Sequence, residues 1–242
     1  MADHIRYQVP NTTLQRDRTS EWFVPKFGSR NFRISLGILF LPYTSIVTCF
    51  AAWGSLSGPF EIERLIAVSI MYFLAVGISA HFLDAVGGKT KPWGMLPKKK
   101  ITTVALISLG IVFTIGFYYA FLDSLLLIPI GIIEVFFLFA YNLELFGGKF
   151  HNNASTIFSW GILPVFAGSV IQTNSITIEA VIYSAIAAII TYVLIITSRK
   201  YKHLCQTNSD KSLINKKENL LKLITFGVIG TTTVFILIRL FF

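Results

Sequence analysis

Seven long apolar stretches, three of them without any charged residue and none with more than two, constrain this chain more than any other feature of its sequence. A helix needs about 20 apolar residues to cross the hydrocarbon core of a bilayer. Charged residues make up only 14% of the chain, against about 25% in a typical soluble domain. We therefore predict an all-α, polytopic membrane helical bundle of about seven transmembrane helices, at 34–53, 64–83, 101–121, 124–143, 155–172, 178–198 and 219–241.

The basic residues predict how this bundle is oriented. The net charge is +9, and if the N-terminus is cytoplasmic, all 21 lysines and arginines except Arg64 and Arg239 lie on the cytoplasmic side. This bias follows the positive-inside rule. We expect a multi-pass protein of the cell membrane with a cytosolic tail (1–33), a transmembrane domain (34–242) and the C-terminus outside. Because the basic clusters lie at the ends of apolar stretches, they argue against a nucleic acid partner.

Two ten-residue segments that close the second and fourth stretches resemble each other. The segments 80–89 and 140–149 are identical at five of ten positions, and each carries one acid followed by Gly-Gly-Lys. Both follow an even-numbered crossing, so both are expected on the cytosolic side. We interpret them as a parallel internal repeat, in which each unit is two helices plus one motif.

The acids of these motifs are candidate metal ligands. A carboxylate such as Asp84 or Glu144 near the membrane boundary is costly unless it is paired or binds a cation. Mg²⁺ usually binds one or two carboxylates together with substrate phosphates. His81 lies one helical turn before Asp84, and Tyr141 precedes Glu144 in the matching place, so both are candidate catalytic residues.

The residues after each acid suit an anion. Gly88 and Gly148 let the backbone leave the helix and present N–H groups. Lys89 and Lys149 add positive charge where a phosphate would lie. Two such motifs, meeting at one end of a helical bundle, can hold a magnesium-bridged diphosphate with its lipid chain among the apolar helices.

Two further residues are candidates for ligand contact. Glu134 lies in the middle of the fourth stretch, where an acid is a functional candidate by default, either for binding or for relaying protons. On one continuous helix, Glu144 would share its face about 15 Å away. His151 follows the second motif on an expected cytosolic loop, from which it can touch a polar head group.

The two motifs give the chain a resemblance to the UbiA-type intramembrane prenyltransferases, over roughly residues 34–198. Asp84 resembles an acid of that family's first motif, and His81 stands near its usual amide residue. Asn142 and Glu144 match the second motif, with Tyr141 and Lys149 in the places of its Tyr and Lys. The resemblance implies Mg²⁺, a prenyl diphosphate donor and transfer of the prenyl group to a lipophilic acceptor within the membrane.

Alternatives from other functional classes remain open on the sequence. Each motif carries a single acid, because Gly88 and Gly148 stand where the family usually has a second one. This favours a non-catalytic lipid-binding subunit of a larger membrane complex. Glu134 instead favours a small transporter that moves protons.

Overall fold

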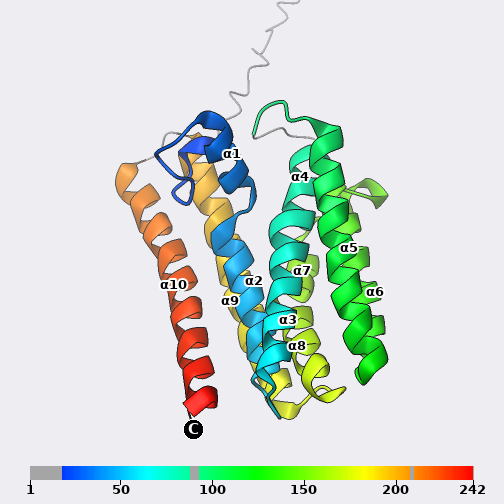
Figure 1. Ribbon diagram of the computed structural model, residues 1–242. Coiled ribbons are helices and arrows are strands. Elements are labelled where there is room, and N and C mark those ends of the chain that lie inside the picture. Colours follow the sequence, from blue (N-terminus) through cyan, green and yellow to red (C-terminus); the bar gives the residue numbers. More distant parts are fainter. Residues whose placement is uncertain (1–17, 88–92, 208–209, 242) are drawn as a thin grey trace, which may run out of the picture.

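The computed structural model describes residues 18–87, 93–207 and 210–241, and it folds them into a bundle of roughly antiparallel helices (Figure 1). Within these ranges, six helical crossings are long and apolar enough to span a membrane, and the shorter apolar helix α6 (Leu127–Asn142) makes a seventh. The predicted all-helical bundle of about seven apolar crossings is therefore confirmed. The described chain starts at the end of the bundle opposite to the C-terminus, as an odd number of crossings requires.

Several crossings consist of more than one helical element. The elements in chain order are η1 (Arg18–Ser20), α1 (Arg30–Ile38), α2 (Leu41–Ser55), α3 (Ile62–Tyr72), η2 (Phe73–Ala80), α4 (His81–Gly87), α5 (Lys98–Leu122), α6, η3 (Phe146–Gly148), α7 (Asn153–Thr156), η4 (Ile157–Ile162), α8 (Leu163–Thr173), α9 (Ile178–Gln206) and α10 (Lys211–Phe241). The segments η2 and η4 are π-helical, whereas η1 and η3 are short 3₁₀ turns. The second and fifth crossings thus each contain a widened turn.

The first crossing is broken between α1 and α2. Phe40 adopts a left-handed conformation with φ 45°, and Pro42 follows at the start of α2. Proline has no N–H to continue the helical ladder, so backbone carbonyls near it lose their partners. The Leu39 carbonyl accepts a hydrogen bond from the Thr44 hydroxyl (2.7 Å) and another from His81 Nδ1 (3.1 Å). Side chains therefore stabilise the break.

Helix α2 forms the centre of the bundle and packs against α8 at very short range. A Cβ on Gly54 would lie 1.8 Å from the Val165 carbonyl oxygen, and one on Gly168 would lie 1.9 Å from that of Ala51. Only glycine allows two helix backbones to approach so closely. In contrast, α5, α6 and α10 expose many large apolar side chains on their outer faces, as expected of surfaces that contact lipid.

The segment before the first crossing folds onto the end of the bundle where both motifs lie, which we call the motif end. Val24 and Trp93 are both 2% exposed there. Arg33 donates hydrogen bonds to the carbonyls of Thr19 (2.7 Å) and Pro25 (2.8 Å), so it fixes the segment against α1. Residues 18–29 of the expected tail are thus part of the packed structure, and α1 begins at Arg30.

Candidate functional site

The two motifs meet at the motif end of the bundle. A Cβ on Gly87 would lie 2.7 Å from Leu143 Cδ2 and 3.1 Å from the Asn142 carbonyl oxygen, so the end of α4 touches the end of α6. The carboxylates of Asp84 and Glu144 are close enough for their charges to interact. Segments that are 60 residues apart in the sequence therefore form one site.

The second motif leaves its helix earlier than the sequence suggested. Helix α6 ends at Asn142, and Glu144 takes a left-handed conformation with φ 49°. The expectation that Glu144 continues the helix face of Glu134 is therefore wrong. The N–H of Gly148 donates to the carbonyls of Glu144 (3.0 Å) and Leu145 (3.1 Å), so the turn itself uses this group rather than presenting it to an anion.

Asp84 lies half-buried among basic side chains. Arg18, Lys202 and His151 all lie within electrostatic range of its carboxylate, and no described residue donates a hydrogen bond to it. Arg199 adds a further cation beside Lys202. The site therefore combines two acids with a group of cations, which can attract an anionic head group.

Sequence reasoning missed Arg18 and Lys202. Arg18 lies in the expected tail, where its guanidinium stacks 4.9 Å from the centre of the Phe40 ring. Lys202 lies in the expected loop after residue 198, but α9 continues to Gln206 because Tyr201 and Cys205 are buried on its inner face. This apolar spacing of four residues was the signal that could have extended the predicted helix.

The lysines predicted to bind phosphate do not define the site. Lys149 is exposed, and its carbonyl accepts a hydrogen bond from Asn152 Nδ2 at 2.8 Å. Gly88 and Lys89 lie outside the described residues. The cations that the structure brings to the motif acids come instead from η1 and α9.

His81 occupies a buried place behind the motifs. It is 6% exposed and packs against the rings of Phe40 and Trp160. Since a carbonyl can only accept, the bond to Leu39 places the proton on Nδ1. His81 therefore helps to hold the broken first crossing, and this bond occupies one of the two nitrogens that the predicted catalytic role would use.

Tyr141, Asn142 and His151 form a compact group at the end of α6. The rings of Tyr141 and His151 are stacked with centroids 4.1 Å apart, and His151 Nδ1 donates to the Tyr141 carbonyl at 3.3 Å. Thr156 and Arg199 lie close to the Tyr141 hydroxyl. Asn142 Nδ2 donates to the Leu138 carbonyl at 2.7 Å, which leaves its side-chain oxygen available.

An apolar cavity of about 350 Å³ begins beneath this group. Tyr141 and Asn142 line its motif end, and Glu134 lines it further along α6. Residues from both π-helical segments contribute to its wall, including Val76 from η2 and Trp160 from η4. Such widened turns occur frequently at functional sites. The cavity therefore has polar side chains at its motif end, which we call the mouth, and an apolar interior.

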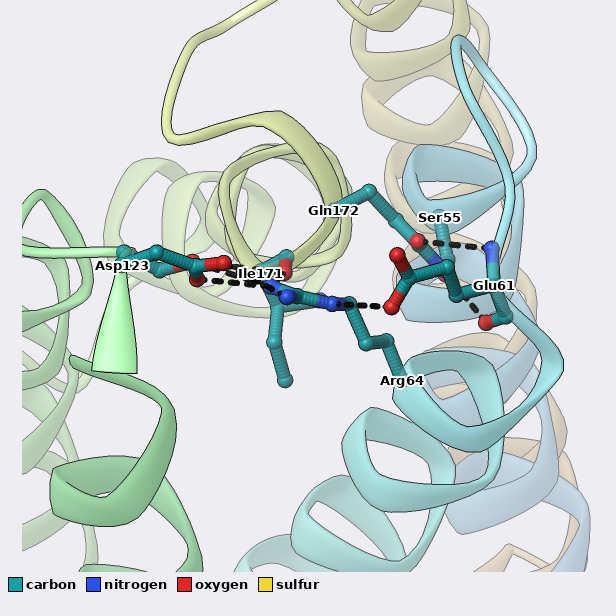
Figure 2. Close-up of polar contacts among 7 residues, drawn as sticks. Ser55, Glu61, Arg64, Asp123, Ile171 and Gln172 are labelled. Carbon is teal, nitrogen blue, oxygen red and sulfur yellow. Dashed lines mark hydrogen bonds and ion pairs between the residues drawn. The ribbon is translucent and has the colours of Figure 1, made fainter. Parts of the chain in front are cut away.

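The opposite end of the bundle is held by Arg64 (Figure 2). Its two Nη atoms bind the Asp123 carboxylate at 2.8 and 2.6 Å, while Nε binds Glu61 at 2.7 Å. Nη1 also donates to the Ile171 carbonyl at 2.6 Å. The Arg64 guanidinium holds the pKa of Asp123 at about 2, below its ordinary value. Arg64, one of the two exceptions to the charge bias, is thus paired with two acids.

Known proteins offer no match to this chain: no protein family, curated protein or solved structure is similar to it at a significant level. In the described ranges, no group of three or more histidine, cysteine, aspartate or glutamate side chains is placed to hold a metal ion. Asp84 and Glu144 suit Mg²⁺ only together with a ligand that supplies further oxygens, as a bound diphosphate would.

Proposed function

We propose that this chain is a UbiA-type intramembrane transferase that moves a prenyl group from a prenyl diphosphate to a lipophilic acceptor. One observation carries the proposal: the two motifs converge on a mouth of mixed charge, directly above an apolar cavity that Tyr141 and Asn142 line at its end. A diphosphate suits the cations of the mouth, and an isoprenoid chain suits the cavity.

In the proposed reaction, the bond between the prenyl carbon and the diphosphate oxygen breaks. The diphosphate leaves with the electron pair, and the acceptor bonds to the prenyl carbon and loses a proton. Arg18, Arg199 and Lys202 would stabilise the charge that grows on the departing diphosphate. Aromatic faces near the mouth, such as Tyr141 and Trp160, would favour the allylic cation.

Mg²⁺ is the proposed cofactor, and Asp84 and Glu144 are the residues that would hold it. When bound, the ion would offset the negative charge of the diphosphate. The charge bias of the sequence supports a cytoplasmic motif end and an external C-terminus in the cell membrane. The donor would then bind from the cytoplasm, and its chain would extend into the membrane.

The direct test is transfer by the purified protein. We expect incubation with radiolabelled prenyl diphosphates, membrane lipid extract and Mg²⁺ to give a labelled lipid product, and Asp84→Asn or Glu144→Gln to lower its rate at least tenfold. Glu63→Gln is the matched control, because Glu63 is an exposed acid at the other end of the bundle. No product from the wild type, or equal rates in the motif variants, would contradict the proposal.

A second candidate is a lipid-binding subunit without catalytic activity. Gly88 and Gly148 stand in place of a second acid in the two motifs, and the resulting single carboxylate per motif favours this candidate. This reading predicts that a prenyl diphosphate raises the melting temperature of the protein while no product forms. A third candidate, proton-linked transport through Glu134, predicts transport activity that Glu134→Gln abolishes.

A further inference from the structure

The wall of the apolar cavity includes the carboxyl group of Glu134, and among the described residues only one of its two oxygens has a hydrogen-bond partner. Tyr72, at the end of α3, donates its hydroxyl to Glu134 Oε1. The second oxygen, Oε2, accepts no hydrogen bond from any described residue. Both residues line the cavity, so Oε2 is available to a ligand there.

The surroundings of this pair make an unpartnered oxygen costly. Glu134 lies eight residues before Asn142 on α6, which places it about 12 Å from the mouth. The nearby cavity wall is mostly apolar and includes Met71, Leu109, Val112, Phe113 and Leu138. A polar group in such an environment costs free energy unless it is hydrogen-bonded. A purely hydrocarbon ligand would displace water and leave Oε2 without a partner.

We propose that the Tyr72–Glu134 pair is a binding site for the neutral hydroxyl group of a lipophilic alcohol that occupies the cavity. The hydroxyl donates to Oε2, and the apolar remainder of the ligand contacts the cavity wall. An anionic group would have to lose its hydration in a cavity with no cationic side chain among the described lining residues. An ammonium would have to lose its hydration in a cavity where Glu134 is the only acid among the lining residues. This binding requires no diphosphate, so it is independent of prenyl transfer.

Trp160 provides the readout, because it lines the same cavity. A bromine atom quenches the fluorescence of a nearby tryptophan, so we would titrate the purified protein with a terminally brominated long-chain alcohol and with the bromoalkane of equal length. A single hydrogen bond to the Glu134 carboxyl group changes affinity by up to roughly tenfold. We therefore expect saturable quenching by both probes, with the alcohol binding up to about tenfold more tightly.

Variants test the assignment of each group. In Glu134→Leu the preference for the alcohol should disappear, whereas Glu134→Gln should keep most of it because the amide oxygen also accepts. In Trp160→Phe the saturable quenching should be lost, and its persistence would place the ligand elsewhere and overturn the proposal. Equal affinities in the wild type, an unchanged preference in Glu134→Leu, or tighter binding of the matching bromoalkyl amine would also overturn it. These titrations do not measure prenyl transfer. If the protein failed to transfer a prenyl group, the binding of the alcohol would therefore be unaffected.

Discussion

Replacing Arg64 with leucine should destabilise the bundle at the end opposite to the motifs. The side chain of Arg64 is 9% exposed, whereas those of Asp123 and Glu61 are 51% and 67% exposed. The two acids can therefore rehydrate when the arginine is removed, and each lost pair costs only about 0.2 to 1 kcal/mol. The carbonyl of fully buried Ile171 cannot rehydrate; it keeps the Ser124 hydroxyl as a donor (3.3 Å) but loses its shorter, charged one, which costs about 1 to 3 kcal/mol.

These contributions together predict a loss of about 3 kcal/mol. For a chain of this size, such a loss lowers the melting temperature by roughly 6 to 12 °C. The assay is thermal unfolding of the purified protein in detergent, followed by circular dichroism. Arg64→Lys should give an intermediate value, because a single ammonium cannot reproduce the planar fork that binds Asp123 and the Ile171 carbonyl together.

Arg239→Leu is the matched control for this experiment. Arg239 is exposed and donates to one carbonyl, that of Gly58, so its loss should change stability by no more than about 0.5 kcal/mol. The reasoning would be refuted if Arg64→Leu melted within a degree or two of the wild type. Equal destabilisation by both variants would show that the buried carbonyl is not the important partner.

Three other outcomes follow from the structure. The hydrogen bonds from Arg64 lower the pKa of Asp123 to about 2, so the stabilisation contributed by the Asp123 carboxylate is complete above about pH 4 and is lost toward pH 2. The melting temperatures of the wild type and of Asp123→Asn should therefore converge as the pH falls from about 4 to about 2. Gly168→Ala should lower the melting temperature sharply, because its Cβ would overlap the Ala51 carbonyl, whereas Gly110→Ala meets no atom within 4 Å and should be neutral or stabilising. His81→Phe should destabilise the protein by about 0.5 to 1.5 kcal/mol in chemical unfolding, since the Leu39 carbonyl loses the bond from His81 but keeps the one from Thr44.

The crossings were predictable from the sequence because apolar length alone decides them. Each predicted stretch overlaps one crossing of the structure, and differences are confined to the ends. Helix α9 ends at Gln206 rather than at the predicted residue 198, because buried Tyr201 and Cys205 continue its inner face beyond the hydrophobic stretch. Hydropathy averages over a window and cannot detect two buried residues among lysines.

The site was predictable only in part. The likeness of the two motifs predicted that they meet at one end of the bundle, and Gly87 indeed packs against the second motif. Arg18 and Lys202 could not be assigned to the site, because their contacts depend on how distant segments pack. The left-handed Glu144 could not be foreseen either, since positive φ is uncommon for residues other than glycine.

The length of α6 has a consequence for the surrounding bilayer. Its 16 residues rise about 24 Å, which is less than the roughly 30 Å thickness of a typical hydrocarbon core, whereas the 25 residues of neighbouring α5 exceed that thickness. Lipids beside α6 must compress to match it, at a modest cost per ångström of mismatch. The lipid chains beside α6 are therefore compressed, and the protein should fit best in membranes with a thin hydrocarbon core.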